Sequence, residues 1–130
     1  MALNLLKDKV MKKLLIVDDQ KMYLLSLEVA LRKSYEVTTA QNYNEAVEKL
    51  KGDVDMALLD IRLDGKDESN IDGLKLLEWI QMNKPEVTAY VMSAYREFNY
   101  AEQALNMGAK HFFRKPIDII GLIAILREKG

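Results

Sequence analysis

Short apolar runs alternate with longer segments of helical periodicity along almost the whole chain. A run of about five apolar or β-branched residues between turn-forming residues is typical of a strand that its neighbours bury. The five expected strands are Lys13–Val17, Glu36–Thr39, Met56–Leu59, Thr88–Met92 and Lys110–Phe113. Because helical segments separate them, consecutive strands are expected to run parallel, with each helix serving as the crossover.

The segments that follow these strands carry apolar residues at the spacing of an α-helix. Four of the expected helices are Gln20–Lys33, Gly73–Met82, Glu97–Met107 and Asp118–Glu128. A further helix is expected after the second strand, with Asn42 or Asn44 as its cap and Gly52 at its end. The helix Gln20–Lys33 is predicted from the repeat of Met22, Leu25, Val29 and Leu31.

The last helix carries more apolar residues than one inward stripe requires. Its expected core face is Ile119, Leu122, Ile123 and Leu126, with Ile120 and Ile125 flanking that face. Spare apolar residues indicate either a wide core stripe or a surface for a partner or a second copy of the chain, and the pattern favours neither.

Five consecutive strand–helix units predict an α/β fold, a doubly wound (βα)5 parallel sheet with helices on both faces. Right-handed crossovers, and the charged residues that end the first, third and fifth strands, favour the strand order 2-1-3-4-5. Ligands of such sheets bind outside the carboxyl ends of the strands where the order reverses, which is here between the first and third strands.

Length and composition indicate one globular domain. The chain has 130 residues, a formal net charge of -1 and no cysteine. A charge so close to zero gives no basic surface for nucleic acid and no reason to expect a membrane, and the lack of cysteine excludes disulfides and thiol catalysis. No segment has the length of a membrane span or the pattern of a signal peptide, so a cytoplasmic protein is expected.

Residues Met1–Val10 precede the first strand as an N-terminal extension, and residues 11–130 form the expected domain. Leu3, Leu6 and Val10 have helical spacing, so the extension is expected to be either a short helix or disordered.

Charged residues end three of the expected strands. Asp18 and Asp19 follow the first strand, Asp60 the third and Lys115 the fifth. A parallel sheet places these ends at one edge, so three carboxylates and one ammonium are expected close together. One ammonium does not neutralise three carboxylates, and oxygen ligands favour Mg²⁺, which binds one or two carboxylates and leaves positions for phosphate oxygens. Helix capping explains one of the paired aspartates but not the whole set.

Asp60 beside Mg²⁺ is suited to attack a phosphoryl donor. In-line phosphoryl transfer requires positioning and neutralisation of charge, which Mg²⁺ and Lys115 would supply. Ser93 ends the fourth strand, and its hydroxyl is suited to donate to a phosphate oxygen. The alternatives are a surface ion pair for Lys115 and a turn or capping role for Ser93. His111, the only histidine, is expected to be an ordinary strand residue.

The functional candidates stand at successive strand ends, as Asp18-Asp19, Asp60, Ser93-Ala94 and Lys115-Pro116. This pattern resembles the receiver domain of bacterial two-component response regulators, and the resemblance extends from about Met11 to Glu128. It implies a flavodoxin-like fold and a signalling switch that phosphorylation controls. A receiver assists its own phosphorylation and dephosphorylation but is not an enzyme that acts on an outside substrate.

The resemblance also implies a role for each acidic residue. Asp60 would accept a phosphoryl group from a sensor histidine kinase, a phosphotransfer protein or a small phosphodonor. Asp18 and Asp19 would hold Mg²⁺ together with Asp60 and the backbone carbonyl of Arg62.

Three further residues would respond to the phosphoryl group. Ser93 and Lys115 would contact its oxygens, and Phe112 would be the aromatic switch residue that turns inward as Ser93 moves. The alternative for Phe112 is an ordinary aromatic residue of the sheet. The output would be a changed surface on the fourth helix, fifth strand and fifth helix. A second copy of the chain is one partner that this surface would bind, which would give a homodimer.

The chain departs from the family pattern after the third strand. The family has a Met-Pro pair where this chain has Leu63-Asp64, and Asp72-Gly73 comes about five residues late. The inserted segment Asp64–Asn70 is polar and acidic, so a tolerated, mobile surface loop is expected. Because the segment borders the site, an effect on Mg²⁺ affinity or on the lifetime of the phosphoryl group is the alternative.

Two other functions compete with the switch. A receiver-like interaction domain that is not phosphorylated would keep the fold, but the complete acidic set argues against it. A Mg²⁺-dependent aspartyl phosphatase usually has a second acid two residues after its nucleophile, where this chain has Arg62. Arg62 and Tyr95 flank the site, and their bulk is expected to hinder water from hydrolysing the phosphoryl group.

Overall fold

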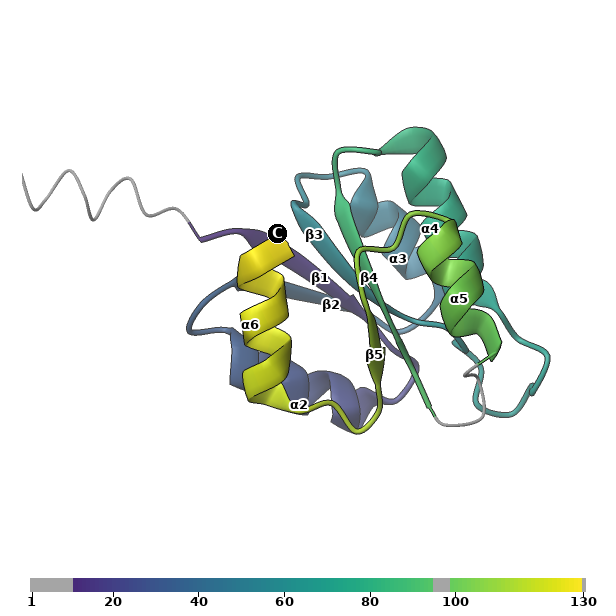
Figure 1. Ribbon diagram of the computed structural model, residues 1–130, viewed down its shortest axis with the longest axis horizontal. Coiled ribbons are helices and arrows are strands. Elements are labelled where there is room, and N and C mark those ends of the chain that lie inside the picture. The colour runs from purple at the N-terminus through teal and green to yellow at the C-terminus, as the bar shows by residue number, and fades with distance from the viewer. Residues whose placement is uncertain (1–10, 95–98, 130) are drawn as a thin grey trace, which may run out of the picture.

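The computed structural model describes residues 11–94 and 99–129, which form a five-stranded sheet with helices on both faces (Figure 1). The strands are β1 (Lys13–Val17), β2 (Glu36–Ala40), β3 (Met56–Asp60), β4 (Thr88–Ser93) and β5 (Phe112–Arg114). The helices are α2 (Lys21–Leu31), α3 (Tyr43–Leu50), α4 (Asp72–Asn83), α5 (Asn99–Asn106) and α6 (Ile119–Lys129). The sheet order is β2-β1-β3-β4-β5 with all neighbours parallel, so the predicted doubly wound, flavodoxin-like fold is confirmed.

Two apolar layers cover the two faces of the sheet. Successive residues of a strand point to opposite faces, and β3 sends Leu59 into one layer and Leu58 into the other. Helices α3, α4 and α5 cover the face of Leu59, and α2 and α6 cover the face of Leu58 (Figure 1). The functional edge of the sheet is therefore held between two packed layers, which limits how far its strand ends move.

Helix α2 buries only Leu31 of the repeat that predicts it, and the rest of its buried face is a different stripe. The buried set is Leu24, Leu27 and Leu31, whereas Met22, Leu25 and Val29 are 76%, 50% and 48% exposed. Both sets have helical spacing, so periodicity alone does not distinguish them. Packing against the sheet, which local periodicity does not encode, selects the buried stripe.

Helix α6 agrees better with its prediction. Leu122 and Leu126 are fully buried, while Ile119, Ile123 and Ile125 pack against the same core at partial exposure. Ile120 is 81% exposed. A wide core stripe accounts for most of the apolar residues of this helix and leaves one of them at the surface.

The ends of the elements follow local hydrogen bonding. Asn42 caps α3, because its Oδ1 accepts the Glu45 N–H at 2.9 Å and its Nδ2 donates to the Glu45 carboxylate at 2.9 Å. Strand β5 begins two residues later than predicted, because only its three residues from Phe112 to Arg114 form the ladder with β4. The predictions for residues 1–10 and for a helix start at Glu97 lie outside the described residues.

Within residues 11–94 and 99–129, no helix combines the length and apolar character that crossing a membrane requires.

Replacing Tyr90 with phenylalanine is expected to leave stability unchanged or to raise the free energy of unfolding by about 1 kcal/mol. Tyr90 is fully buried on β4, and its hydroxyl has no hydrogen-bond partner among the described residues. Burial, with a smaller effect of Tyr35, raises the pKa of Tyr90 to about 12, so the hydroxyl stays neutral. Urea unfolding of Tyr90→Phe beside Tyr43→Phe, a change at a partly exposed tyrosine, measures the effect. A loss of stability specific to Tyr90→Phe would mean that the hydroxyl bonds to a trapped water molecule.

Candidate metal centre

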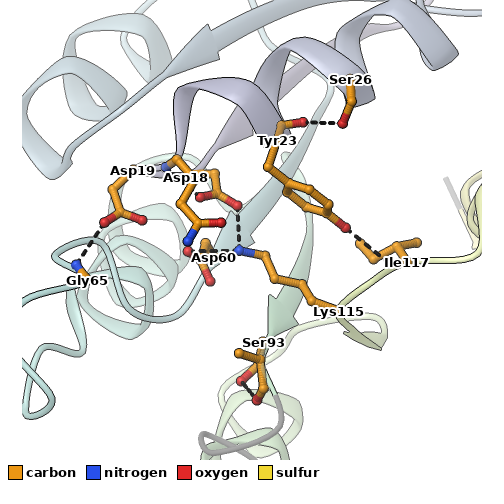
Figure 2. Close-up of polar contacts among 11 residues, drawn as sticks. Asp18, Asp19, Tyr23, Ser26, Asp60, Gly65, Ser93, Lys115 and Ile117 are labelled. Carbon is orange, nitrogen blue, oxygen red and sulfur yellow. Dashed lines mark hydrogen bonds and ion pairs between the residues drawn. The ribbon is translucent and has the colours of Figure 1, made fainter.

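The carboxyl ends of β1 and β3 bring three aspartates together (Figure 2). Asp60 is the last residue of β3, and Asp18 directly follows β1, whose Val17 pairs with Leu59. One carboxylate oxygen from each of Asp18, Asp19 and Asp60 lies within 4.8 Å of the others. The acidic cluster predicted from the strand ends is therefore present.

Two hydrogen bonds hold Asp18 in place, one made by its backbone and one by its side chain. Its N–H donates to the carbonyl of Ala40 at 3.1 Å, and its Oδ1 accepts the Gln20 N–H at 2.8 Å. The second of these bonds is the turn-forming role that the capping interpretation assigns to such an aspartate. It uses one oxygen only, so Asp18 Oδ2 remains directed toward the centre of the cluster.

Lys115 reaches the cluster from the turn after β5. Its Nζ lies 2.6 Å from Asp18 Oδ2 and 3.3 Å from Asp60 Oδ2, and its side chain is 14% exposed. The Lys115 N–H donates to the Ser93 carbonyl at 2.9 Å, which fixes its backbone to the end of β4. The fifth-strand lysine thus belongs to the cluster, and the alternative of an ordinary surface ion pair is wrong.

The electrostatics of the cluster show that Lys115 does not compensate all of the negative charge. Burial and then the Asp18 carboxylate raise the pKa of Asp60 to about 8, against the opposing effect of Lys115. Burial also raises the pKa of Asp18. Burial lowers the pKa of Lys115, but Asp60 and Asp18 outweigh it and the net shift is upward. Without a further cation, the negative charge of the cluster favours a protonated Asp60 carboxyl and a charged Lys115 ammonium.

The donor set fits a hard divalent cation. The ligand atoms are all carboxylate oxygens, two of the aspartates are buried, and Asp19 lies partly exposed at the rim. A hollow of about 50 Å³ adjoins them, lined by Asp19, Gln20, Asp60, Arg62, Gly65, Ala94 and Lys115. Such a site has room for one ion with water or a small anion beside it. Asp18 Oδ2 is buried and lies 2.6 Å from the Lys115 ammonium, and it is suited to contact a cation bound among the three aspartates.

Ser93 and Phe112 lie on β4 and β5, the two strands that follow β3 in the sheet. Ser93 is fully buried at the end of β4, and its hydroxyl donates to the carbonyl of Ala94 at 3.0 Å (Figure 2). Phe112 is partly buried and lines a hollow of about 420 Å³ with Leu105 and other residues of α5. Arg62 borders the acidic hollow, and Tyr95 lies outside the described residues. His111 stands beside Phe113, with ring centroids 4.6 Å apart.

The inserted segment forms two successive turns rather than an extended excursion. Asp67 N–H donates to the Asp64 carbonyl, and Asn70 N–H donates to the Asp67 carbonyl, both at 3.1 Å. The Asn70 Oδ1 accepts the N–H groups of Leu63 and Asp72, each at 3.0 Å, and so closes the base of the loop. The segment between Leu63 and Asp72 is therefore closed at its base, directly before α4.

The segment also reaches the acidic cluster. Gly65 N–H donates to Asp19 Oδ2 at 2.8 Å, as Figure 2 shows. The loop therefore orients one of the three carboxylates. The sequence indicates that the segment borders the site but not this bond, because a backbone amide leaves no mark in the pattern of side chains. Tyr23 is a second residue that sequence reasoning missed, and its ring contacts the Nζ of Lys115.

Comparison with known proteins gives a consistent result. A family model described as the response regulator receiver domain matches residues 14–127. The transcriptional regulatory protein ZraR of Klebsiella oxytoca is 33% identical over 117 residues, which cover 88% of this chain and 25% of that protein. The sporulation initiation phosphotransferase F of Bacillus subtilis is 31% identical over 110 residues, which cover 83% of this chain and 85% of that protein. The chain spans 24% to 32% of the length of the first three curated relatives.

The solved structures agree with these matches. A crystal structure of a CheY-like response regulator receiver domain protein from Methanospirillum hungatei superposes with a TM-score of 0.82 and 29% identity, covering 92% of this chain and 94% of that one.

Proposed function

This chain belongs to the response regulator receiver domain family of two-component systems, and on that premise we propose that Asp60 is the phosphoacceptor of its switch. The observation that carries the proposal is the position of Asp60. It ends β3 with its carboxylate 3.3 Å from Lys115 Nζ, beside two further aspartates and an adjoining hollow.

The cofactor we propose is Mg²⁺, held by carboxylate oxygens of Asp18, Asp19 and Asp60 and by the backbone carbonyl of Arg62. Bound there, Mg²⁺ would neutralise charge on the transferring phosphoryl group and on the acceptor carboxylate. The raised pKa of Asp60 supports this assignment, because a cation at the cluster favours the deprotonated carboxylate that the chemistry needs.

The phosphoryl step forms one bond and breaks one. A carboxylate oxygen of Asp60 bonds to the phosphorus, and the bond from phosphorus to the donor breaks with its electron pair going to the leaving group. The leaving group is acetate when the donor is acetyl phosphate, and an imidazole nitrogen when it is a phosphohistidine of a kinase or phosphotransfer protein. Lys115 would hold a phosphoryl oxygen, and the 3.3 Å separation of its Nζ from the Asp60 carboxylate supports this role.

The switch would follow from rearrangement of Ser93 and Phe112. The Ser93 hydroxyl now donates to Ala94, and it would turn to donate to a phosphoryl oxygen instead. The hollow between Phe112 and α5 would change shape as Ser93 and the end of β4 move. The surface of α5, β5 and α6, where Leu105 is 46% and Ile120 is 81% exposed, would carry the change to a partner or a second copy.

Intact mass after incubation with acetyl phosphate and Mg²⁺ tests the proposal. We expect a single phosphoryl adduct that requires Mg²⁺, is absent from Asp60→Asn and persists in Asp64→Asn. Asp64 is an exposed aspartate of the inserted loop, so it is a matched control for the loss of one carboxylate near the site. An adduct on Asp60→Asn would show that another residue is the acceptor.

The same samples separate the two competing functions. Turnover of a generic phosphoester with Mg²⁺, at a rate that Asp60→Asn abolishes, would favour a phosphatase. Failure to form an adduct from either acetyl phosphate or a panel of phosphorylated kinases, together with no Mg²⁺ binding, would favour an interaction domain that is not phosphorylated.

A further inference from the structure

Tyr23 on α2 contacts both the ammonium and the turn of Lys115. The Lys115 Nζ lies 4.8 Å from the centroid of the Tyr23 ring. The Tyr23 hydroxyl accepts the N–H of Ile117 at 3.1 Å, a bond between residues 94 positions apart in the chain. Figure 2 shows the ring beside the lysine side chain, with its hydroxyl toward Ile117. These two contacts come from opposite ends of one side chain and converge on the same short segment.

Together with Ser93, Tyr23 fixes the backbone of that segment at two points. The Lys115 N–H donates to the Ser93 carbonyl, and two residues later the Ile117 N–H donates to the Tyr23 hydroxyl. The lysine side chain therefore leaves a segment that is tied to β4 on one side and to α2 on the other. Its ammonium then meets Asp18, Asp60 and the face of the Tyr23 ring.

An aromatic face suits this location better than an aliphatic side chain would. A cation beside a ring is attracted by the negative charge of the ring face, and the attraction grows when the cation is shielded from water, as Lys115 is at 14% exposure. Unlike a fourth carboxylate, the ring adds no net charge to a cluster that is already too negative. It also leaves the ammonium free to exchange one oxygen partner for another.

We propose that Tyr23 is a positioning residue for Lys115, holding its ammonium at the place where a phosphoryl oxygen on Asp60 arrives. The expected effect on phosphorylation rests on the proposed function. The placement of Lys115 by Tyr23 does not depend on it. The competing explanation is that Tyr23 only packs against the apolar core on the α2 and α6 face, to which its ring also belongs.

A double-mutant cycle separates the two explanations. The variants are Tyr23→Leu, Tyr23→Phe, Lys115→Met and Tyr23→Leu with Lys115→Met, and the quantity is the rate of adduct formation from acetyl phosphate at saturating Mg²⁺. We expect Tyr23→Leu to slow the reaction about tenfold and Tyr23→Phe, which keeps the ring, about threefold or less. In the Lys115→Met background, Tyr23→Leu should change the rate less than about twofold, because the group through which it acts is gone.

Equal slowing in both backgrounds, or none in either, would overturn the proposal. Tyr43→Leu is the matched control, because Tyr43 is a partly buried tyrosine that packs on the opposite face of the sheet, and it should leave the rate unchanged.

A second measurement does not depend on phosphorylation. In the metal-free protein, the ring should shift the NMR resonances of the Lys115 ε-methylene protons, which are assigned by their loss in Lys115→Met. Tyr23→Phe should keep that shift and Tyr23→Leu should abolish it. A shift unchanged in Tyr23→Leu would overturn the placement even if Asp60 is phosphorylated, and a lost shift would support it even if Asp60 is not.

Discussion

Replacing Gly73 with alanine should lower the free energy of unfolding by at least about 3 kcal/mol and the melting temperature by about 10 °C or more. Gly73 lies in the first turn of α4, buried against the end of β3. A Cβ at this position would lie 1.9 Å from the Asp60 carbonyl oxygen and 2.6 Å from the Ile61 Cα. These are backbone atoms of the last residue of β3 and of the residue after it, so no side-chain rotation relieves the clash.

The clash would reach the phosphoacceptor candidate itself. Gly73 N–H donates to the Ile61 carbonyl at 2.8 Å, so moving α4 away from β3 breaks this bond and draws Leu74 and Leu77 out of the core. If the chain relaxes on the strand side instead, the backbone of Asp60 moves. In either case Gly73→Ala should also slow phosphorylation in the fraction that remains folded.

Urea unfolding of Gly73→Ala beside Gly52→Ala measures the effect. At Gly52 an added Cβ would be 3.4 Å from the Lys49 carbonyl oxygen, an ordinary contact, so that variant should stay within about 0.5 kcal/mol of the parent. Equal stability of the two variants would mean that the first turn of α4 moves freely on β3.

The tight contact at Gly73 also explains the shape of the inserted loop. The start of α4 must contact the end of β3, so additional residues in this connection have to form a loop that projects from the protein and returns. Asn70 closes that excursion by accepting the N–H groups of Leu63 and Asp72. The sequence indicates the insertion and its polar character, but the two turns and the contact of Gly65 with Asp19 depend on packing that no local pattern encodes.

The architecture and most of the site were predictable because both depend on strand ends. An apolar run that ends in a charged residue indicates both a strand and the edge of the sheet at which it ends. The sequence alone therefore predicts that Asp18, Asp60 and Lys115 lie together. The face of α2 was not predictable, because Leu24 and Leu25 belong to two stripes of equal periodicity and tertiary packing chooses between them. The contacts of Tyr23 were not predictable for a related reason, since one of them joins residues 94 positions apart.

Without a divalent cation, the free energy of unfolding is expected to fall as the pH rises from about 5 to about 8, and Asp60→Asn should flatten that fall. Burial and the Asp18 carboxylate raise the pKa of Asp60 from 3.8 to about 8. Between these values the folded chain keeps a proton that the unfolded chain has lost, so raising the pH favours unfolding. The contribution is complete below pH 3.8 and is lost as the pH rises through about 8. The raised pKa of Asp18, caused chiefly by its burial, acts in the same direction.

Urea unfolding between pH 5.5 and 8.5, in EDTA and in Mg²⁺, tests this result on the parent chain, Asp60→Asn and Asp67→Asn. At pH 8 in EDTA, Asp60→Asn should be more stable than the parent by on the order of 2 kcal/mol, because an amide relieves the buried charge. Asp67 is an exposed aspartate whose pKa is lowered by hydrogen bonds from Ser69, so Asp67→Asn should run parallel to the parent over this range. Mg²⁺ should close most of the gap, since a cation that binds only the folded chain stabilises it. Parallel curves for Asp60→Asn and the parent in EDTA would mean that Lys115 alone balances the carboxylates, and the electrostatic case for a metal at this edge would fall with them.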